Sequence, residues 1–292
     1  MKKFVALCVL AFSLIVSIAA CQATGDRIVI GTKNFTEQII LGEILAQQIE
    51  SKTKLKVDRK FNLGGTYVCF NGIRNGELDI YPEYSGTAYT AILKLPAIGD
   101  AQKVFETVQQ RFDRDFRLEW SKPFGFNNSF AIVVRGEDAR RYKIQTLSQA
   151  SAQTPQWRAG FGFEFLNRED GFPGLAKTYN LRFADKPKTM DLGLLYRALQ
   201  DRQVDLVAGN TTDGLLSSLD LTVLQDDKKY FPPYEAAAIV RQEALQKHPE
   251  LRQAIDELGN KISEKTMREL NYRVDGKKED VKQVVQEFLR SK

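Results

Sequence analysis

Three segments of the sequence combine polar residues with the predicted start of a helix. They are residues 31–38, 84–87 and 209–214, and each follows a predicted strand. Free backbone N–H groups at a helix N-terminus attract carboxylates, and the faces of aromatic rings attract organic cations. A cleft that offers both groups suits a zwitterion. Ser, Thr, Asn and Gly are also common as helix caps and turn residues, so the pattern by itself leaves that interpretation open.

Residues that could carry out covalent chemistry are few. The single histidine, His248, lies in a polar segment that predicts a helix junction at the surface, so Ser–His and Cys–His arrangements have little support. Cys69 lies in an apolar stretch, which is typical of a small buried side chain rather than a reactive thiol. The alternative is a secreted enzyme that uses Cys69 or the carboxylates of Glu164 and Asp170. We expect no enzymatic activity, no metal site and no cofactor.

The first 20 residues have the features of a secretory signal. A short basic start is followed by an almost unbroken apolar run over residues 4–18 and by two alanines before Cys21. This pattern predicts a bacterial lipoprotein signal peptide, residues 1–20, that is cleaved before Cys21, whose thiol is then acylated. An ordinary signal peptide or an N-terminal anchor is the alternative. We therefore expect a lipid-anchored protein in the periplasm or on the outer face of the cell membrane.

Charge and cysteine content limit the possible partners. The formal net charge is +5, and loss of Lys2 and Lys3 with the signal leaves +3. Basic and acidic residues are interspersed without a long run of either sign, so we expect no nucleic-acid partner. Only Cys69 would remain as a free thiol, so stability has to come from packed cores rather than from an internal disulfide. We expect a monomer.

The mature sequence alternates short β-rich runs with helical patterns, which is typical of α/β folds. The predicted strands cover residues 27–31, 55–61, 77–81, 130–134, 158–163, 181–184 and 204–208. The predicted helices cover residues 36–49, 85–93, 101–112, 171–179, 192–201 and most of 242–292. Because the pattern restarts after residue 128, we predict two lobes, with one large doubly wound domain as the alternative. In either case the three polar segments lie at the carboxyl ends of strands, where ligands bind in such folds.

Several motifs in both halves of the chain occur in a fixed order. They cover residues 33–38, 63–66, 79–87, 164–171, 211–214 and 224–234. Together they resemble the substrate-binding proteins of ABC importers for glycine betaine, choline and carnitine, over nearly all of residues 27–275. The resemblance implies a type II periplasmic-binding-protein fold, in which two α/β lobes joined by a two-segment hinge close on the ligand. It predicts one lobe from residues 26–127 and 233–292 and the other from residues 128–232.

The resemblance also implies roles for individual residues. In betaine binders an aromatic box holds the quaternary ammonium group, and polar groups hold the carboxylate. Matched by motif, the box tyrosines correspond to Tyr84 and Tyr234. The groups on the carboxylate side correspond to Lys33, Thr87 and Arg168, and a position that lines the pocket corresponds to Gln38.

Two positions depart from the family pattern. Phe130 stands where betaine binders commonly have a box tyrosine, so it keeps the ring face and loses the hydroxyl. Asn210 stands where another box tyrosine usually lies, so one aromatic wall becomes a polar amide. The resemblance then predicts a larger pocket that is less selective for a bare trimethylammonium group.

These observations predict a binding protein that captures a quaternary-ammonium zwitterion and delivers it to an ABC permease in the membrane. Glycine betaine or a related osmoprotectant is the expected solute, and ergothioneine, choline or carnitine is the alternative. Ergothioneine is a betaine with an imidazole-thione ring, which would use the Asn210 amide. A binding domain with a sensor or matrix role is a further alternative, although no signalling or adhesion segment supports it.

Overall fold

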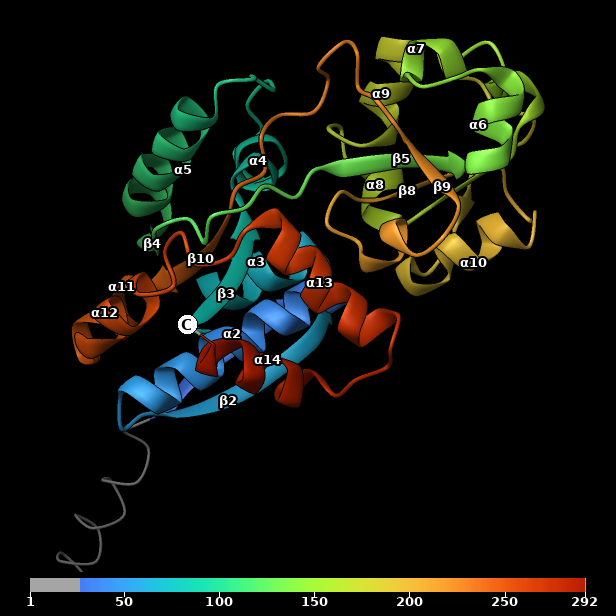
Figure 1. The fold of residues 1–292 in the computed structure, drawn as a ribbon. Helices are drawn as coiled ribbons and strands as arrows, with labels where there is room; N and C mark the ends of the chain where they lie inside the picture. The colour runs from blue at the N-terminus through green and yellow to red at the C-terminus, as the bar shows by residue number, and fades with distance from the viewer. Residues whose placement is uncertain (1–26, 292) are drawn as a thin grey trace, which may run out of the picture.

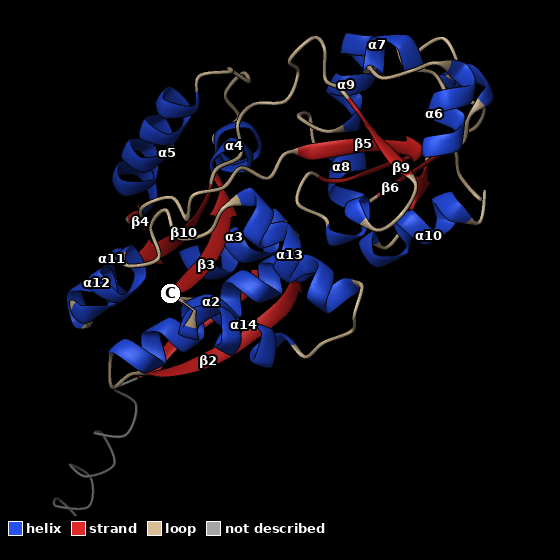
Figure 2. Cartoon of the chain, viewed as in Figure 1, coloured by secondary structure: helices blue, strands red, loops and turns tan. Residues whose placement is uncertain are grey.

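Two five-stranded sheets organise the protein, one in each of two α/β lobes (Figures 1 and 2). The structure is a computed structural model and describes residues 27–291. The expected signal sequence and Cys21 lie outside these residues. The two separate sheets confirm the predicted two-lobed α/β fold and show that the alternative of one large doubly wound domain is wrong.

The first lobe is built from both ends of the described chain. Its sheet has the strand order β2-β1-β3-β10-β4, in which β1 runs parallel to β2 and β3 while β10 runs antiparallel to β3 and β4. The strands are β1 (Arg27–Lys33), β2 (Lys56–Gly64), β3 (Ile80–Tyr84), β4 (Leu118–Trp120) and β10 (Ala236–Arg241). The helices are α2 (Thr36–Lys52), α3 (Thr66–Arg74), α4 (Ser85–Thr87), η1 (Ala88–Ile92), α5 (Ala101–Phe116), α11 (Gln242–Lys247), α12 (Glu250–Asp256), α13 (Glu264–Asp275) and α14 (Val281–Arg290).

The second lobe is formed by the middle of the chain. Its sheet has the order β7-β6-β8-β5-β9, with β6 parallel to β7 and β8, and β5 antiparallel to β8 and β9. The strands are β5 (Phe130–Arg135), β6 (Ala159–Phe161), β7 (Lys188–Thr189), β8 (Leu206–Asn210) and β9 (Leu221–Leu224). The helices are α6 (Gly136–Tyr142), α7 (Leu147–Ala150), η2 (Thr154–Gln156), α8 (Phe163–Asn167), α9 (Phe172–Tyr179), η3 (Leu192–Leu194), α10 (Leu195–Gln200) and η4 (Gly214–Ser217).

Two antiparallel segments connect the lobes. The chain leaves the first lobe after β4 and returns before β10, as the green and orange crossings in Figure 1 show. The two crossings form an antiparallel bridge between Asn127 and Glu235. Asn128 N donates to Tyr234 O at 3.0 Å, and Ala236 N donates to Phe126 O at 3.2 Å. The hinge is therefore a short two-stranded ribbon.

Each sheet is covered by apolar side chains on both of its faces. In the first lobe, Ile30 and Ile80 pack with α2, whereas Tyr81 and Ile239 pack on the opposite face with α5. The second lobe has two further buried clusters, one on each side of its sheet. Strands buried on both faces need near-continuous apolar runs, which explains why most of them were recognisable in the sequence.

Some expectations need correction. Residues 181–184 are not a strand, and the strands β4, β7, β9 and β10 were not predicted. His248, in the junction between α11 and α12, is 7% exposed and therefore buried rather than at the surface.

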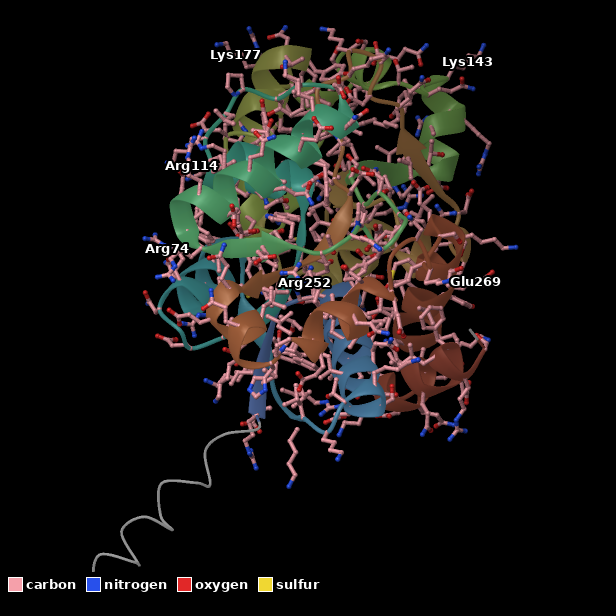
Figure 3. All side chains as sticks on the ribbon, turned by 90° about the vertical axis from the view of Figure 1, so that its left-hand side faces the viewer. Arg74, Arg114, Lys143, Lys177, Arg252 and Glu269 are labelled. Atoms are coloured by element: carbon pink, nitrogen blue, oxygen red, sulfur yellow. The ribbon has the colours of Figure 1, made fainter. Side chains whose placement is uncertain are left out.

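The surface carries charges of both signs. Charged side chains project from both lobes, among them Arg114, Lys143 and Glu269 (Figure 3). Within residues 27–291, no helix has the length and apolar character needed to cross a membrane.

Candidate functional site

A cavity of about 260 Å³ lies between the two lobes. This volume is close to the lower end of small-molecule sites, which begin at about 300 Å³, so the cavity suits a small solute. Seven of its lining residues are aromatic, namely Phe35, Tyr67, Tyr84, Phe130, Phe163, Phe165 and Tyr234. The others are Lys33, Asn34, Gly65, Val68, Thr87, Asn128, Gly162, Glu164, Arg168, Met190, Asp191, Leu192, Ala208, Gly209 and Asn210.

Strand ends place the main groups of this cavity. Lys33 is the last residue of β1 and Tyr84 the last residue of β3, and these parallel strands are neighbours in the first sheet. Across the cleft, Phe130 begins β5 and pairs in register with Asn210, which ends β8. The three polar segments of the sequence therefore meet at one cavity, as the rule for α/β sheets predicts.

Aromatic side chains form adjacent walls of the cavity. The Phe130 ring lies 5.8 Å from the Tyr234 ring and 4.8 Å from the Phe165 ring, measured between centroids, and both contacts are edge-on. Gly86 allows Tyr234 to take this place, because a Cβ at Gly86 would lie 2.7 Å from the Tyr234 ring. Ring faces in such an arrangement attract an organic cation.

The basic groups of the cavity have acidic partners within the protein. Lys33 Nζ lies 2.5 Å from Glu83 Oε1, and Arg168 Nε donates to Asp170 Oδ1 at 2.8 Å. Burial raises the pKa of Glu83 above its ordinary value. Burial also acts to raise the pKa of Asp170, but the charge and hydrogen bonds of Arg168 outweigh it and hold this pKa below its usual 3.8.

Charged side chains of both signs line the cavity. Lys33 and Arg168 are basic, whereas Glu164 and Asp191 are acidic. Glu164 also joins the lobes, because its carboxylate accepts hydrogen bonds from Thr66 N at 2.6 Å and from Thr66 Oγ1 at 2.9 Å. A cavity with aromatic walls and charged groups of both signs can offer a partner to each end of a zwitterion.

Seven of the eight expected site residues line the cavity. They are Lys33, Tyr84, Thr87, Phe130, Arg168, Asn210 and Tyr234. Gln38 is not among the lining residues. It is fully buried, and its Oε1 accepts a hydrogen bond from Lys33 N at 3.3 Å. The structure therefore places Gln38 behind the wall that Lys33 forms, where it supports the wall without facing the cavity.

The sequence analysis missed several lining residues. Phe35 and Phe165 lie inside motifs that were recognised, so their aromatic side chains were available as a signal. Val68, Phe163 and Leu192 had no such signal. Phe163 is 70% exposed and Val68 51% exposed, so neither follows a pattern of buried residues.

The groups that an enzyme would need are not set up for catalysis. Cys69 is fully buried, and burial raises the pKa of its thiol to about 12, so the reactive thiolate is absent near neutral pH. The carboxylates of Glu164 and Asp170 are engaged by Thr66 and Arg168. Among residues 27–291, no group of three or more His, Cys, Asp and Glu side chains is placed to hold a metal ion.

Residues 26–291 match the protein family described as the substrate-binding domain of ABC-type glycine betaine transport systems. The chain belongs to this family. It is therefore a binding protein of an ABC importer rather than an enzyme, and the secreted-enzyme alternative is wrong. Members of this family act outside the cytoplasm, which confirms that part of the expected location, whereas the lipid anchor stays a prediction.

Relatives of known function cover the described chain. The carnitine transport binding protein OpuCC of Listeria monocytogenes is 38% identical over 298 residues, which span 99% of this chain and 96% of OpuCC. The ergothioneine transport permease/ergothioneine binding protein EgtU of Helicobacter pylori is 38% identical over 264 residues, which span 90% of this chain. This chain covers about half of EgtU, 47% of its length.

A solved structure supports the same fold. The crystal structure of a glycine betaine/carnitine/choline ABC transporter superposes with a TM-score of 0.73 at 35% identity. The match covers 90% of this chain and 98% of that chain. The two-lobed periplasmic-binding-protein fold of this family is thus confirmed.

Proposed function

We propose that this chain captures a small quaternary-ammonium zwitterion between its lobes and delivers it to an ABC permease. Glycine betaine, or a related osmoprotectant, is the proposed solute. The observation that carries the proposal is the combination of aromatic walls and charged groups of both signs in a cavity of about 260 Å³. A quaternary ammonium group forms no N–H hydrogen bonds, so ring faces are the groups that recognise it best.

Each end of the solute has its own set of groups. The rings of Tyr84, Phe130 and Tyr234 are assigned to the ammonium end, and Phe130 and Tyr234 contact each other edge-on. Lys33 Nζ lies 5.3 Å from the centroid of the Tyr84 ring and Arg168 Cζ 5.5 Å from that of the Phe130 ring, so the groups for the two ends of the solute adjoin each other. The carboxylate binds on the side of Lys33 and Arg168, with the Thr87 hydroxyl beside them. Lys33 and Arg168 retain N–H groups beyond those that Glu83 and Asp170 occupy, because an ammonium has three donors and a guanidinium has five.

Lobe boundaries and anchoring are part of the same proposal. We place one lobe at residues 26–127 and 233–292 and the other at residues 128–232, with the hinge ribbon between them. The protein works as a monomer, held at the membrane by acylated Cys21 after cleavage of residues 1–20. The lipobox pattern supports the anchor, and the interspersed charge at the surface is consistent with a single copy.

Calorimetry on the soluble chain tests the proposed function. Glycine betaine should bind, and 3,3-dimethylbutyrate should bind much more weakly. This acid has the same shape with a carbon in place of the cationic nitrogen, so the difference isolates the interaction of the cation with the rings. Equal binding of the two compounds, or no binding of any quaternary-ammonium compound, would contradict the proposal.

Ergothioneine is the second candidate, and Asn210 favours it. Asn210 N donates to Asp213 Oδ2 at 2.8 Å, and Asn210 Nδ2 faces Asp213 Oδ1 at 3.4 Å, which directs the amide oxygen away from Asp213. An amide oxygen in the cavity accepts a hydrogen bond from a ring N–H, which ergothioneine has and glycine betaine lacks. The ergothioneine-binding relative EgtU at 38% identity supports this candidate. Competition between the two solutes in the same calorimeter decides between them.

A further inference from the structure

One buried carboxylate lies where the two lobes and the hinge meet. Glu37, in the first turn of α2, is 2% exposed. Its Oε1 accepts hydrogen bonds from the Tyr84 hydroxyl at 2.7 Å and from Asn128 Nδ2 at 2.7 Å. Its Oε2 accepts hydrogen bonds from Thr212 Oγ1 at 2.5 Å and from Asn271 Nδ2 at 3.0 Å.

The four donors come from parts of the chain that are far apart in sequence. Tyr84 ends β3 and Asn271 lies in α13, both in the first lobe. Thr212 follows β8 in the second lobe, and Asn128 lies in the hinge just before β5. Asn271 Nδ2 also donates to Thr212 O at 2.9 Å, so a second bond crosses between the lobes at this point.

These bonds stabilise the ionised form of Glu37 and oppose the effect of burial, which raises its pKa above the ordinary value. A carboxylate accepts about four hydrogen bonds, so all of its acceptor positions are occupied by the four donors. A neutral amide of the same shape would present an N–H group to donors and would lose at least one bond. The first turn of a helix also favours negative charge.

The same donors adjoin the walls of the ligand cavity. Tyr84 is itself a cavity wall, Asn128 lies two residues before Phe130, and Thr212 lies two residues after Asn210. Glu37 itself does not line the cavity. Its hydrogen-bond partners therefore include one wall residue of the first lobe, Tyr84, and two residues that lie close in sequence to the second-lobe wall residues Phe130 and Asn210.

We infer that Glu37 is a positioning residue that couples closure of the lobes to the placement of the Tyr84 ring. This inference rests on the proposed function, since it explains how a solute held by Tyr84 stabilises the closed form. When the lobes close, Thr212 reaches Glu37 and completes its hydrogen bonds. The carboxylate then holds the Tyr84 hydroxyl, and therefore its ring, in one orientation towards the cation.

Two variants test the inference from opposite lobes. Glu37→Gln keeps the size of the side chain and removes an acceptor, while Thr212→Val removes only the donor from the second lobe. We expect each to weaken binding of glycine betaine, or of ergothioneine if that solute binds more tightly, by about tenfold or more, because a bond to a charged group is lost. The double variant should weaken binding by less than the product of the two effects, because both changes remove the same bond.

Matched controls separate positioning from general stability. Glu43→Gln changes another carboxylate of α2 that is 2% exposed, but its partners Arg59 and Gln47 all lie within the first lobe. Thr154→Val removes a buried threonine bond, from Thr154 Oγ1 to Ser151 O, within the second lobe. Both controls should lower the melting temperature and leave the affinity unchanged.

Small-angle X-ray scattering supplies the second measurement. At a solute concentration that saturates the wild type, Glu37→Gln and Thr212→Val should retain a larger radius of gyration than the two controls. Wild-type affinity and radius in both variants would overturn the inference while leaving the proposed function intact. If the wild type binds neither solute, the proposed function is wrong and the inference falls with it.

Discussion

Lys33 Nζ lies 2.5 Å from Glu83 Oε1, and both side chains are almost fully buried at the carboxyl ends of neighbouring strands. The protein thus supplies an internal counter-ion for a basic group that lines the cavity. Such a pair keeps the cavity free of net positive charge before the solute arrives. A buried pair gains little stability overall, but breaking it leaves an isolated charge that is almost fully buried.

The first prediction concerns this pair. Glu83→Gln should lower the free energy of unfolding by about 3–5 kcal/mol, because it leaves the Lys33 ammonium buried without a counter-ion. Denaturant titration followed by circular dichroism measures the change. The double variant Lys33→Met with Glu83→Gln is the control and should recover part of the loss, since it removes the isolated charge. A single variant within 1 kcal/mol of the wild type would show that water reaches Lys33.

The second prediction concerns pH. Asp170 accepts hydrogen bonds from Thr90 Oγ1 at 2.7 Å and from the Tyr234 hydroxyl at 3.1 Å, in addition to its pair with Arg168. Its pKa lies below the ordinary 3.8, so its contribution to stability is complete above pH 3.8 and is lost as the pH falls through the lowered value. The free energy of unfolding of the wild type should therefore fall below pH 3.8 more steeply than that of Asp170→Asn. Parallel curves for the two proteins would show that Asp170 does not titrate in this way.

Much of the fold was predictable because its strands are buried on both faces. The apolar run in β1 and the helical spacing of Ile40 and Ile44 in α2 are strong signals. β10 was missed although it is an interior strand of the first sheet, between β3 and β4. Its sequence, with three consecutive alanines, has little strand propensity, and its place is fixed by pairing with β3 rather than by local preference.

The site was predictable where family motifs cover it. Glu37 was part of a recognised motif, yet its role depends on Asn271, which is 234 residues away in sequence. Nothing local to either residue indicates that they meet. Gln38 is a case in which a recognised motif was misleading. The motif predicted that its side chain lines the cavity, but in the structure it lies behind Lys33.

The third prediction concerns the aromatic walls. Tyr84→Ala and Tyr234→Ala should each weaken binding of the solute by about 1–2 kcal/mol, because each removes a ring face from the cation. Tyr234→Phe keeps the ring face and should lose less, although it loses the hydroxyl bond to Asp170. Tyr84→Phe also removes the hydroxyl that Glu37 holds, so it should weaken binding about as much as Glu37→Gln does. Calorimetry measures the affinities, with Tyr142→Ala, a tyrosine outside the cavity, as the control. Affinities close to the wild type in both alanine variants would exclude these rings from the site.

The fourth prediction concerns the membrane anchor. Cys21→Ala should abolish acylation and release the protein into the soluble extracytoplasmic fraction, because the acylated cysteine supplies the stable hold on the membrane. Cell fractionation with immunoblotting measures the distribution. Cys69→Ala, which changes a buried cysteine of the folded chain, should remain in the membrane fraction. Retention of Cys21→Ala in the membrane to the same extent would contradict the lipobox interpretation.

The last prediction concerns Asn210, which pairs in register with Phe130 across neighbouring antiparallel strands. Side chains at paired positions stand about 5 Å apart on the same face of a sheet. A tyrosine at position 210 would therefore stand beside the Phe130 ring and close the aromatic box on that side.

Asn210→Tyr should accordingly shift the preference of the protein from ergothioneine or carnitine towards glycine betaine. The new ring adds a face for a compact trimethylammonium group and fills space that a longer solute needs, and both effects change the ratio of affinities in the same direction. Competition calorimetry with glycine betaine, carnitine and ergothioneine measures this ratio in the wild type and the variant. Asn210→Gln is the matched control, because it keeps an amide at this position and adds no ring. If the wild type already prefers glycine betaine and Asn210→Tyr leaves the ratio unchanged, Asn210 does not determine which solute is bound.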